Sequence, residues 1–182
     1  MRRVIVEAEI SLDGVFGDGP DFWSQIFKYH SADLTAYLKN LLFSADALLA
    51  GRKTYEAFAH VWPSRTGEDA DRINPMPKYV ASRSLQAPLA WNATLIEGDA
   101  ATAIRELKRH SGRDLVQYGV GELTWTMVKH GLVDELRLVV FPFVFGRGPR
   151  IFESFDPVSF TLVDTTTFSS GAIALHYQPG AT

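Results

Sequence analysis

Three short segments of the chain, each at the end of a predicted strand, carry residue types that suit the binding of phosphate groups. The first is Gly51-Arg52-Lys53-Thr54, which follows the apolar run 47–50. A strand that turns through glycine into a helix leaves free N–H groups at the helix start, and these groups bind anions. Arg52, Lys53 and the Thr54 hydroxyl would add charge and further donors. The competing interpretation is a solvated helix start in which Thr54 only caps the helix.

Two further segments have the same character. Arg83 lies between two serines after the strand candidate 78–82, and two hydroxyls beside a guanidinium suit a phosphate monoester. The stretch 118–123 contains Gly-x-Gly but has Thr124 at the last glycine position of the dinucleotide-binding fingerprint. Each segment alone is equally consistent with an ordinary turn. Together the three predict a site for an extended, phosphate-bearing cofactor.

Asp33 is the carboxylate that stands out as a candidate acid. It falls in the first turn of a predicted amphipathic helix, downstream of the glycine-rich loop 13–20, and from there it would face a cleft. A carboxyl group in that place can assist protonation of a substrate. The alternative is that Asp33 caps the helix or complements its dipole. Asp13, before Gly14, is similarly expected to organise a turn.

Several classes of chemistry are excluded by what the sequence lacks. The chain contains no cysteine, which excludes disulfide scaffolds, thiolate-bound zinc, iron–sulfur clusters and cysteine nucleophiles. The five histidines show no HExxH or similar metal-binding spacing. There is also no Gly-x-Ser-x-Gly elbow and no Gly-x4-Gly-Lys-Ser/Thr phosphate loop. We therefore expect neither a metal site nor a covalent nucleophile.

The candidate residues must be positioned by strands and helices, which alternate along the sequence. The pattern predicts strands at 4–10, 47–50, 78–82, 94–96, 115–118, 135–144, 160–168 and 172–178, and helices at 34–42, directly after 51, at 100–110 and ending at 131. Apolar residues at every second position of the first segment indicate a half-buried strand. Prolines and polar residues at 63–77 predict a surface loop.

This order of elements is typical of an α/β fold. Alternation predicts a mostly parallel sheet with helices on both faces, and the hairpin at 160–178 adds antiparallel strands at one edge. Ligands bind such sheets at the carboxyl ends of the strands. The segments 51–54, 82–84 and 118–123 are all expected at that edge.

Length and composition fit one soluble domain spanning residues 1–182. The chain is 46% hydrophobic and 21% charged, as globular domains usually are. A net charge of −3 without a long basic run argues against nucleic-acid binding. No stretch approaches the roughly 20 apolar residues of a membrane span, and the N-terminus turns acidic too soon for a signal peptide. We expect a cytoplasmic protein that binds neither nucleic acid nor membrane.

Several segments occur in the same order as in a known family. They are 11–15 (Ser-Leu-Asp-Gly-Val), 49–56, 78–83, 119–123, 131–138 and 142–152. Through these segments the chain resembles the dihydrofolate reductase superfamily, specifically the branch related to the C-terminal reductase domain of bacterial riboflavin-biosynthesis enzymes. The resemblance implies one dihydrofolate-reductase-like domain with a mixed, mostly parallel sheet of about eight strands, helices on both faces and a C-terminal antiparallel hairpin.

The resemblance also implies where an NADPH cofactor would lie, across the carboxyl edge of the sheet. The residues implied to bind it are Gly51, Arg52, Lys53, Thr54, Ser82, Arg83, Gly119, Val120, Gly121, Glu122 and Leu123. Ser82 and Arg83 would meet the adenosine 2′-phosphate, which favours NADPH over NADH. The loop 13–23 would form a lid over the nicotinamide. Asp33 stands nearest to the acid that assists substrate protonation in dihydrofolate reductases.

The activity that the resemblance implies is that of a riboflavin-pathway type reductase, with hydride transfer to a C=N or C=O carbon of a small heterocyclic substrate. A phosphoribosylamino-pyrimidine would need extra cations, for which Arg147 and Arg150 are candidates. The alternatives are a true dihydrofolate reductase, a non-catalytic nucleotide-binding module and a domain whose glycine turns are purely structural. The apolar run 139–145 is expected in the core, although a homodimer pairing through it would be ordinary for the family.

Overall fold

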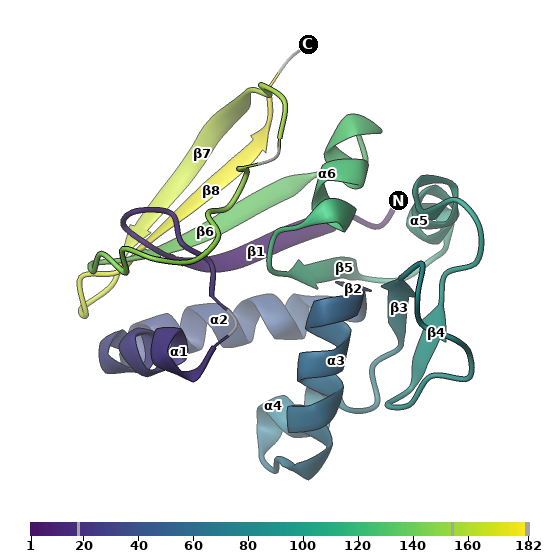
Figure 1. Cartoon of the computed structure of the whole chain (residues 1–182), viewed down its shortest axis with the longest axis horizontal. Helices are drawn as coiled ribbons and strands as arrows, with labels where there is room; N and C mark the ends of the chain where they lie inside the picture. The colour runs from purple at the N-terminus through teal and green to yellow at the C-terminus, as the bar shows by residue number, and fades with distance from the viewer. Residues whose placement is uncertain (18, 154, 181–182) are drawn as a thin grey trace.

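The first strand of the chain lies at the centre of the sheet, with another strand hydrogen-bonded to each of its edges (Figure 1). The computed structural model describes residues 1–17, 19–153 and 155–180. In it, β1 (Val4–Ser11) pairs in parallel with β5 (Asp114–Tyr118) on one side and with β6 (Glu135–Phe141) on the other. The order of the strands across the sheet is β4-β3-β2-β5-β1-β6-β8-β7.

The outer strands differ in direction on the two sides of this centre. β2 (Ala45–Gly51), β3 (Lys78–Ala81) and β4 (Ala93–Leu95) continue the sheet from β5 in parallel. On the other side β8 (Ile173–Pro179) runs antiparallel to β6, and β7 (Phe160–Thr167) runs antiparallel to β8. The predicted α/β fold, mostly parallel with an antiparallel hairpin at one edge, is confirmed.

Helices cover both faces of the sheet (Figure 1). α2 (Ala32–Ser44), α3 (Arg52–Val61) and α4 (Glu68–Ile73) lie on one face. α5 (Ala100–Arg109) and α6 (Glu122–Lys129) lie on the other. Within the described residues, no helix has both the length and the apolar character needed to cross a membrane.

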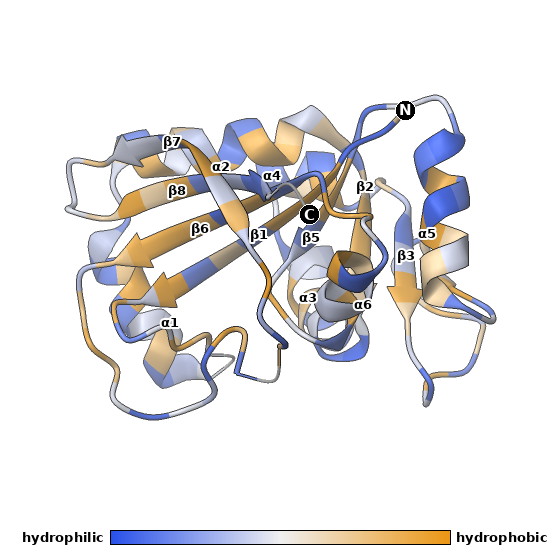
Figure 2. Cartoon of the chain, turned by 90° about the horizontal axis from the view of Figure 1, so that it is seen from above, coloured by the Kyte–Doolittle hydropathy of each residue, from blue (hydrophilic) through white to orange (hydrophobic). Residues whose placement is uncertain are grey.

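Both faces of β1 are buried, so the prediction of a half-buried first strand is wrong. Val4, Val6 and Ala8 pack against residues of α5 and α6, whereas Ile5 packs with residues of α2 and α4 on the opposite face. A strand in the middle of a parallel sheet is covered by crossover helices on both sides, which the alternation alone does not reveal. Glu7 is therefore only 3% exposed. Figure 2 shows a hydrophilic stretch within the otherwise apolar β1.

The segment 63–77 is not a surface loop, which corrects a second expectation. It contains the end of a 3-10 turn, η2 (Trp62–Ser64), and all of α4, whose Ala70 and Ile73 are buried. The three prolines lie outside α4, where they do not interrupt its hydrogen bonds. The Nζ of buried Lys78 donates to the carbonyl of Ile73 at 2.6 Å and so fixes the end of α4 against β3.

The predicted loop 13–23 ends in a short helix. α1 (Pro20–Ile26) begins with a proline, which suits a first helical turn, and η1 (Phe27–Tyr29) leads on toward α2. The buried Phe22 ring stacks edge-on against Phe145 with the ring centres 5.3 Å apart. This contact holds the segment after β1 against the segment after β6.

Candidate functional site

The three candidate phosphate-binding segments follow three neighbouring strands. Because β3, β2 and β5 are adjacent in the sheet, segments 82–84, 51–54 and 119–123 lie side by side at its carboxyl edge. The prediction that they converge on one edge is confirmed. The structure thereby forms a continuous row of turns where the sequence showed only separate motifs.

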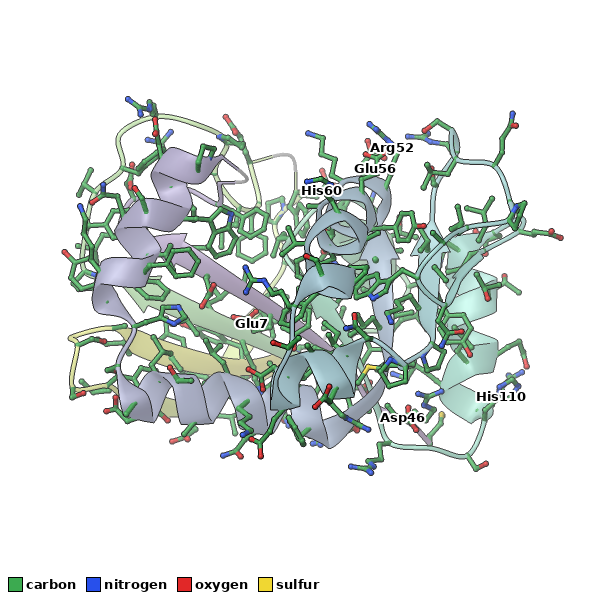
Figure 3. The ribbon with its side chains drawn as sticks, turned by 90° about the horizontal axis from the view of Figure 1, so that it is seen from below. Glu7, Asp46, Arg52, Glu56, His60 and His110 are labelled. Atoms are coloured by element: carbon green, nitrogen blue, oxygen red, sulfur yellow. The ribbon has the colours of Figure 1, made fainter. Side chains whose placement is uncertain are left out.

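The middle turn opens toward solvent. A Cβ added to Gly51 would meet no heavy atom within 4 Å, so the space before the first turn of α3 is free. Arg52 and Lys53 are exposed at this helix start, and Arg52 pairs with Glu56 one turn further along, as Figure 3 shows. The Thr54 hydroxyl donates to the last carbonyl of β5 at 3.4 Å, which ties this turn to its neighbour.

The outer two turns are joined by an ion pair across the middle one. Arg83 lies 2.9 Å from Glu122 in the first turn of α6, and their side chains are 90% and 88% exposed. The Ser82 hydroxyl oxygen accepts from the backbone N–H groups of Ser84 and Leu85, each at 3.1 Å. An ion pair this exposed is weak and is screened by salt, so an incoming phosphate can compete with Glu122 for Arg83.

The turn after β5 is shaped by two glycines with different constraints. Gly119 has φ +82°, and a Cβ there would lie 2.7 Å from the Phe16 ring of the loop that follows β1. Gly121 has an extended backbone and open space in front of it. The side chains of Val120 and Leu123 pack into the core, so these two residues present only their backbone to the edge.

Asp13 joins the loop after β1 to the segment after β6. Its carboxylate accepts from the Ser11 hydroxyl at 2.7 Å and from the N–H groups of Phe145 and Gly146 at 3.0 Å. These hydrogen bonds, that from Ser11 above all, lower the pKa of Asp13 to about 2. The expectation that Asp13 organises a turn is confirmed, and the residue also connects two loops.

A cavity of about 340 Å³ lies between these two loops. Arg147 lines it and pairs with Asp21 of α1 at 2.9 Å. Arg150 donates to the carbonyl of Asp13 at 3.0 Å. Both arginines proposed as partners for an anionic substrate therefore already have acceptors, although their side chains remain largely exposed.

The comparison with known proteins agrees with this geometry. The family model of the RibD C-terminal domain matches residues 2–174. The chain belongs to the RibD C-terminal domain family. Membership confirms the resemblance to the dihydrofolate-reductase-like riboflavin reductase domain.

Individual proteins and solved structures also match over almost the whole chain. The uncharacterized protein YyaP of Bacillus subtilis (strain 168) is 29% identical over 185 residues, covering 97% of this chain and 95% of YyaP. A pyrimidine reductase-like protein from Corynebacterium diphtheriae has the same fold, with a TM-score of 0.68, 12% identity and coverage of 100% and 93%. The deaminase/5-amino-6-(5-phosphoribosylamino)uracil reductase from Thermotoga maritima matches with a TM-score of 0.70 and 16% identity, over 98% of this chain and 57% of that enzyme.

In this member of the RibD C-terminal domain family, Asp33 lies away from the row of turns. Its carboxylate accepts from the backbone N–H and the hydroxyl of Ser169, at 2.8 and 2.9 Å, in the turn between β7 and β8. It also accepts from the Ser31 hydroxyl and from the N–H of Leu34 at 3.0 Å. These bonds, that from Ser31 first, lower the pKa of Asp33, whereas a proton donor needs a raised one. The surroundings of Asp33 are those of a structural anchor.

Two carboxyl groups that sequence reasoning passed over lie closer to the turns. Glu7 and Glu9 project from β1 toward the α2 face, and the carbonyl of Glu7 accepts from the N–H of Gly119 at 2.7 Å. Figure 3 shows Glu7 on β1 between the helices of this face. Burial raises the pKa of Glu7 well above its usual range, and the charge of Glu9 adds to this effect. These residues could have been found from the sequence, because two glutamates lie in a strand that the fold class places at the centre of a sheet.

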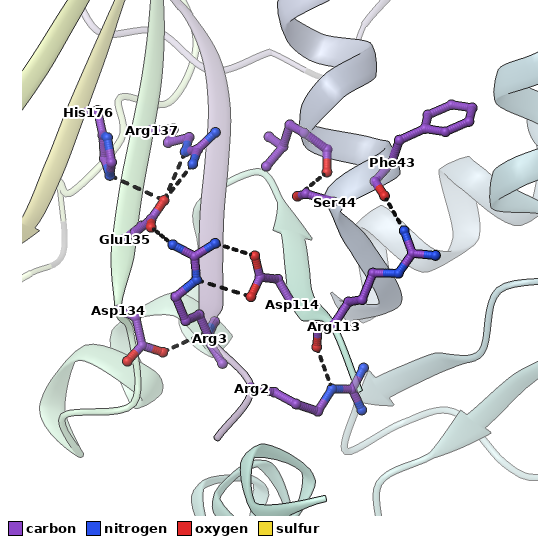
Figure 4. Close-up of polar contacts among 12 residues, drawn as sticks. Arg2, Arg3, Phe43, Ser44, Arg113, Asp114, Asp134, Glu135, Arg137 and His176 are labelled. Atoms are coloured by element: carbon purple, nitrogen blue, oxygen red, sulfur yellow. Dashed lines mark hydrogen bonds and ion pairs between the residues drawn. The ribbon is translucent and has the colours of Figure 1, made fainter. Parts of the chain in front are cut away.

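A network of ion pairs continues this polar region toward the β-hairpin (Figure 4). Glu135 accepts from Arg3 at 2.5 Å and from Arg137 at 2.6 Å, and it lies 3.2 Å from His176. Arg137 stands opposite Glu7 in the β1–β6 register, and its charge opposes the rise of the Glu7 pKa. The one arginine beside Glu7 in the described part of the sheet is therefore shared with another carboxylate.

Replacing Asp33 by alanine is expected to lower the Tm by a few degrees at pH 7, because Ser169 and the start of α2 lose their shared acceptor. A lowered folded-state pKa means that this stabilisation is present above pH 4 and is lost as the pH falls through the folded-state value. The difference in Tm between wild type and Asp33→Ala should therefore shrink on acidification below pH 4. Differential scanning fluorimetry across pH measures it, and equal Tm values at pH 7 would contradict the anchoring role.

Replacing Gly119 by alanine is expected to lower the free energy of unfolding by about 2–4 kcal/mol, since a left-handed backbone and the Phe16 ring both oppose a Cβ. Gly14→Ala is the matched control, because Gly14 has φ +73° but open space around it. We expect the control to lose about 1–2 kcal/mol. Urea denaturation measures the free energy of unfolding of both variants, and the difference between them gives the contribution of the Phe16 contact. Equal losses of stability in the two variants would contradict a steric role for Phe16.

Proposed function

We propose that this protein is a cytoplasmic, NADPH-dependent reductase of the riboflavin-biosynthesis reductase-domain type, acting on a C=N or C=O group of a small heterocyclic substrate. The observation that carries the proposal is the row of three turns on β3, β2 and β5 in a member of the RibD C-terminal domain family. When bound, NADPH supplies a hydride, and the chain must then bind it, orient the substrate and provide a proton.

The residues along the row fit such a cofactor. Gly51 and Gly121 leave open space at the N-termini of α3 and α6, where backbone N–H groups and the helix dipoles favour phosphate oxygens. Arg83 would exchange Glu122 for the adenosine 2′-phosphate, and Arg52 and Lys53 add positive charge beside the pyrophosphate. The relative from Thermotoga maritima, a uracil-derivative reductase by its name, supports the same class of reaction.

Thermal melts with NADPH and NADH test the proposal. At a ligand concentration 100-fold above Kd, binding stabilises the folded state by about 2.7 kcal/mol, which raises the Tm by about 5–10 °C. We expect a larger shift with NADPH than with NADH. Arg83→Ala should make the two shifts equal, and Glu122→Gln should enlarge the NADPH shift because it frees Arg83.

Gly121→Ala is the control that separates binding from folding. Its extended backbone and open surroundings predict an unchanged Tm without ligand. A methyl group before α6 would nevertheless occupy the expected pyrophosphate position and reduce the shift with both nucleotides. Absence of a shift with either nucleotide on the wild-type protein would refute the proposed function.

We also propose that the protein forms a homodimer, but through β7 and not through 139–145. Val139 and Phe141 are fully buried in β6, as expected of core residues, whereas β6 ends at Phe141 and not at Val144, which is 68% exposed. Among the described residues, β7 is the last strand of the sheet and pairs only with β8, and its Leu162 and Val163 are 50% and 49% exposed. An apolar edge of this kind favours pairing with a second copy.

Light scattering after gel filtration should give twice the chain mass of 20.2 kDa. Substituting lysine at both Leu162 and Val163 places positive charges on the edge, and the expected mass is then that of one chain. A wild-type protein of 20.2 kDa would contradict the dimer.

A further inference from the structure

A row of polar side chains crosses the centre of the sheet on its α2 face. Glu7 of β1 stands opposite Tyr118 of β5 and Arg137 of β6, and Arg137 stands opposite His176 of β8. Glu9 follows two residues along β1 on the same face, about 7 Å nearer to the carboxyl edge. The row therefore leads from the interior toward the turn formed by Gly119 and its neighbours.

Two carboxyl oxygens in this row have no hydrogen-bond partner among the described residues. They are Oε1 of Glu7 and Oε1 of Glu9, and both are inaccessible to solvent. The Glu7 residue is 3% exposed, whereas the side chain of Glu9 retains 12% exposure. Buried polar atoms are almost always paired, and an orphaned carboxyl oxygen is unfavourable unless a ligand or a proton satisfies it. Glu9 is the member of the pair nearer to solvent.

The charges around the pair favour a cation over an anion. The charged and titratable groups around the pair and around its neighbours Tyr118 and Arg137 are Glu135 from β6, His176 from β8, Tyr37 from α2, His30 from the segment before α2, and Asp69 from α4. Arg137 is bound to Glu135, and the Nε2 of His30 lies 3.7 Å from Oε1 of Glu9, beyond hydrogen-bond distance. Within the described residues, no unshared arginine or lysine faces Glu9, so a phosphate group would be repelled there.

We infer that Glu9 is the substrate-contacting carboxylate of this enzyme, that Glu7 behind it is a positioning residue holding a proton, and that the substrate is a cyclic imine or amidine that binds as a cation without a phosphate group near the C=N bond. The inference rests on the proposed function and specifies its substrate class. It replaces Asp33, whose carboxylate is fully engaged at the β-hairpin.

These groups account for every proton and electron pair in the reduction of an imine. The imine nitrogen receives a proton from Glu9, which gives an iminium ion paired with the carboxylate. The iminium carbon accepts hydride from the reduced nicotinamide, the C=N π bond becomes a C–H bond and a nitrogen lone pair, and an amine and an oxidised nicotinamide result. Glu9 is then reprotonated from solvent, while Glu7 keeps its proton throughout. One proton is consumed for each imine reduced.

Binding of three isosteric probes tests the substrate class without turnover. Benzamidinium, benzamide and benzoate carry charges of +1, 0 and −1 on the same ring, and calorimetry on NADP⁺-saturated protein measures their affinities. We expect affinity in the order benzamidinium, benzamide, benzoate. Glu9→Gln should weaken benzamidinium at least tenfold, whereas Glu106→Gln, an exposed glutamate on α5, should leave its affinity unchanged.

The role of Glu7 has a readout of its own. A raised folded-state pKa makes ionisation of Glu7 costly, so stability is lost as the pH rises above the usual value of 4.5. Glu7→Gln should therefore be at least as stable as wild type at pH 8 and should keep benzamidinium binding, because the amide still donates a hydrogen bond. With 3,4-dihydroisoquinoline as the imine, reduction by wild type should fall at alkaline pH, and Glu7→Gln should remove that alkaline limb.

The outcomes separate the inference from the proposed function. If NADP⁺ or NADPH shifts the Tm but benzamidinium binds wild type and Glu9→Gln equally, the inference is overturned and the reductase remains. Tighter binding of benzoate than of benzamidinium would also overturn the inference and leave the reductase function intact. If neither nucleotide shifts the Tm, the proposed function fails and the substrate assignment fails with it.

Discussion

The position of β1 between β5 and β6 is the constraint on which the rest of the molecule depends. Parallel pairing on both edges requires crossover helices on both faces, so every β1 side chain points into protein. The loop after β1 then emerges beside the end of β5, where Phe16 covers Gly119. The same pairing brings Glu7 and Glu9 beneath that turn. The pairing of β1 with its two neighbouring strands therefore accounts for the buried core, for the loop that covers Gly119 and for the position of the two glutamates.

The proposed cofactor site and the proposed substrate site differ in their electrostatic character. Backbone N–H groups, helix N-termini and exposed cations border the turns on β3, β2 and β5, and all of them suit anions. A short distance away, on the α2 face of β1, carboxyl groups dominate and the nearby Arg137 is shared. A molecule that spans both regions must carry its negative charge at one end and a basic group at the other. A dinucleotide and a separate basic heterocycle meet this condition together.

Sequence patterns were sufficient for most of the fold and for the position of the row of turns, because both depend on local signals. Polar residues and glycines after apolar runs place segments 51–54, 82–84 and 119–123 at the ends of strands, and the strand order brings the three segments together. Expectations were wrong where the structure depends on contacts between residues that are distant in the sequence. Asp33 is held by Ser169, 136 residues away, and the alternation in β1 indicated an exposed face that crossover helices in fact cover. Helix α4 was hidden by prolines that flank it without entering it.

The joining of two loops by Asp13 bears on how this scaffold can change its specificity. Backbone hydrogen bonds from Leu12 to Phe143, from Phe16 to Pro149 and from Ile151 to Gly14 tie the loop after β1 to the segment after β6. The two loops therefore form a small unit of their own, resting on the sheet edge without belonging to the sheet. Insertions or deletions within that unit would alter access to the turn at Gly119 while leaving the strand register intact. Diversification of specificity within such a fold can thus proceed by loop exchange, with the turns on β3, β2 and β5 unchanged.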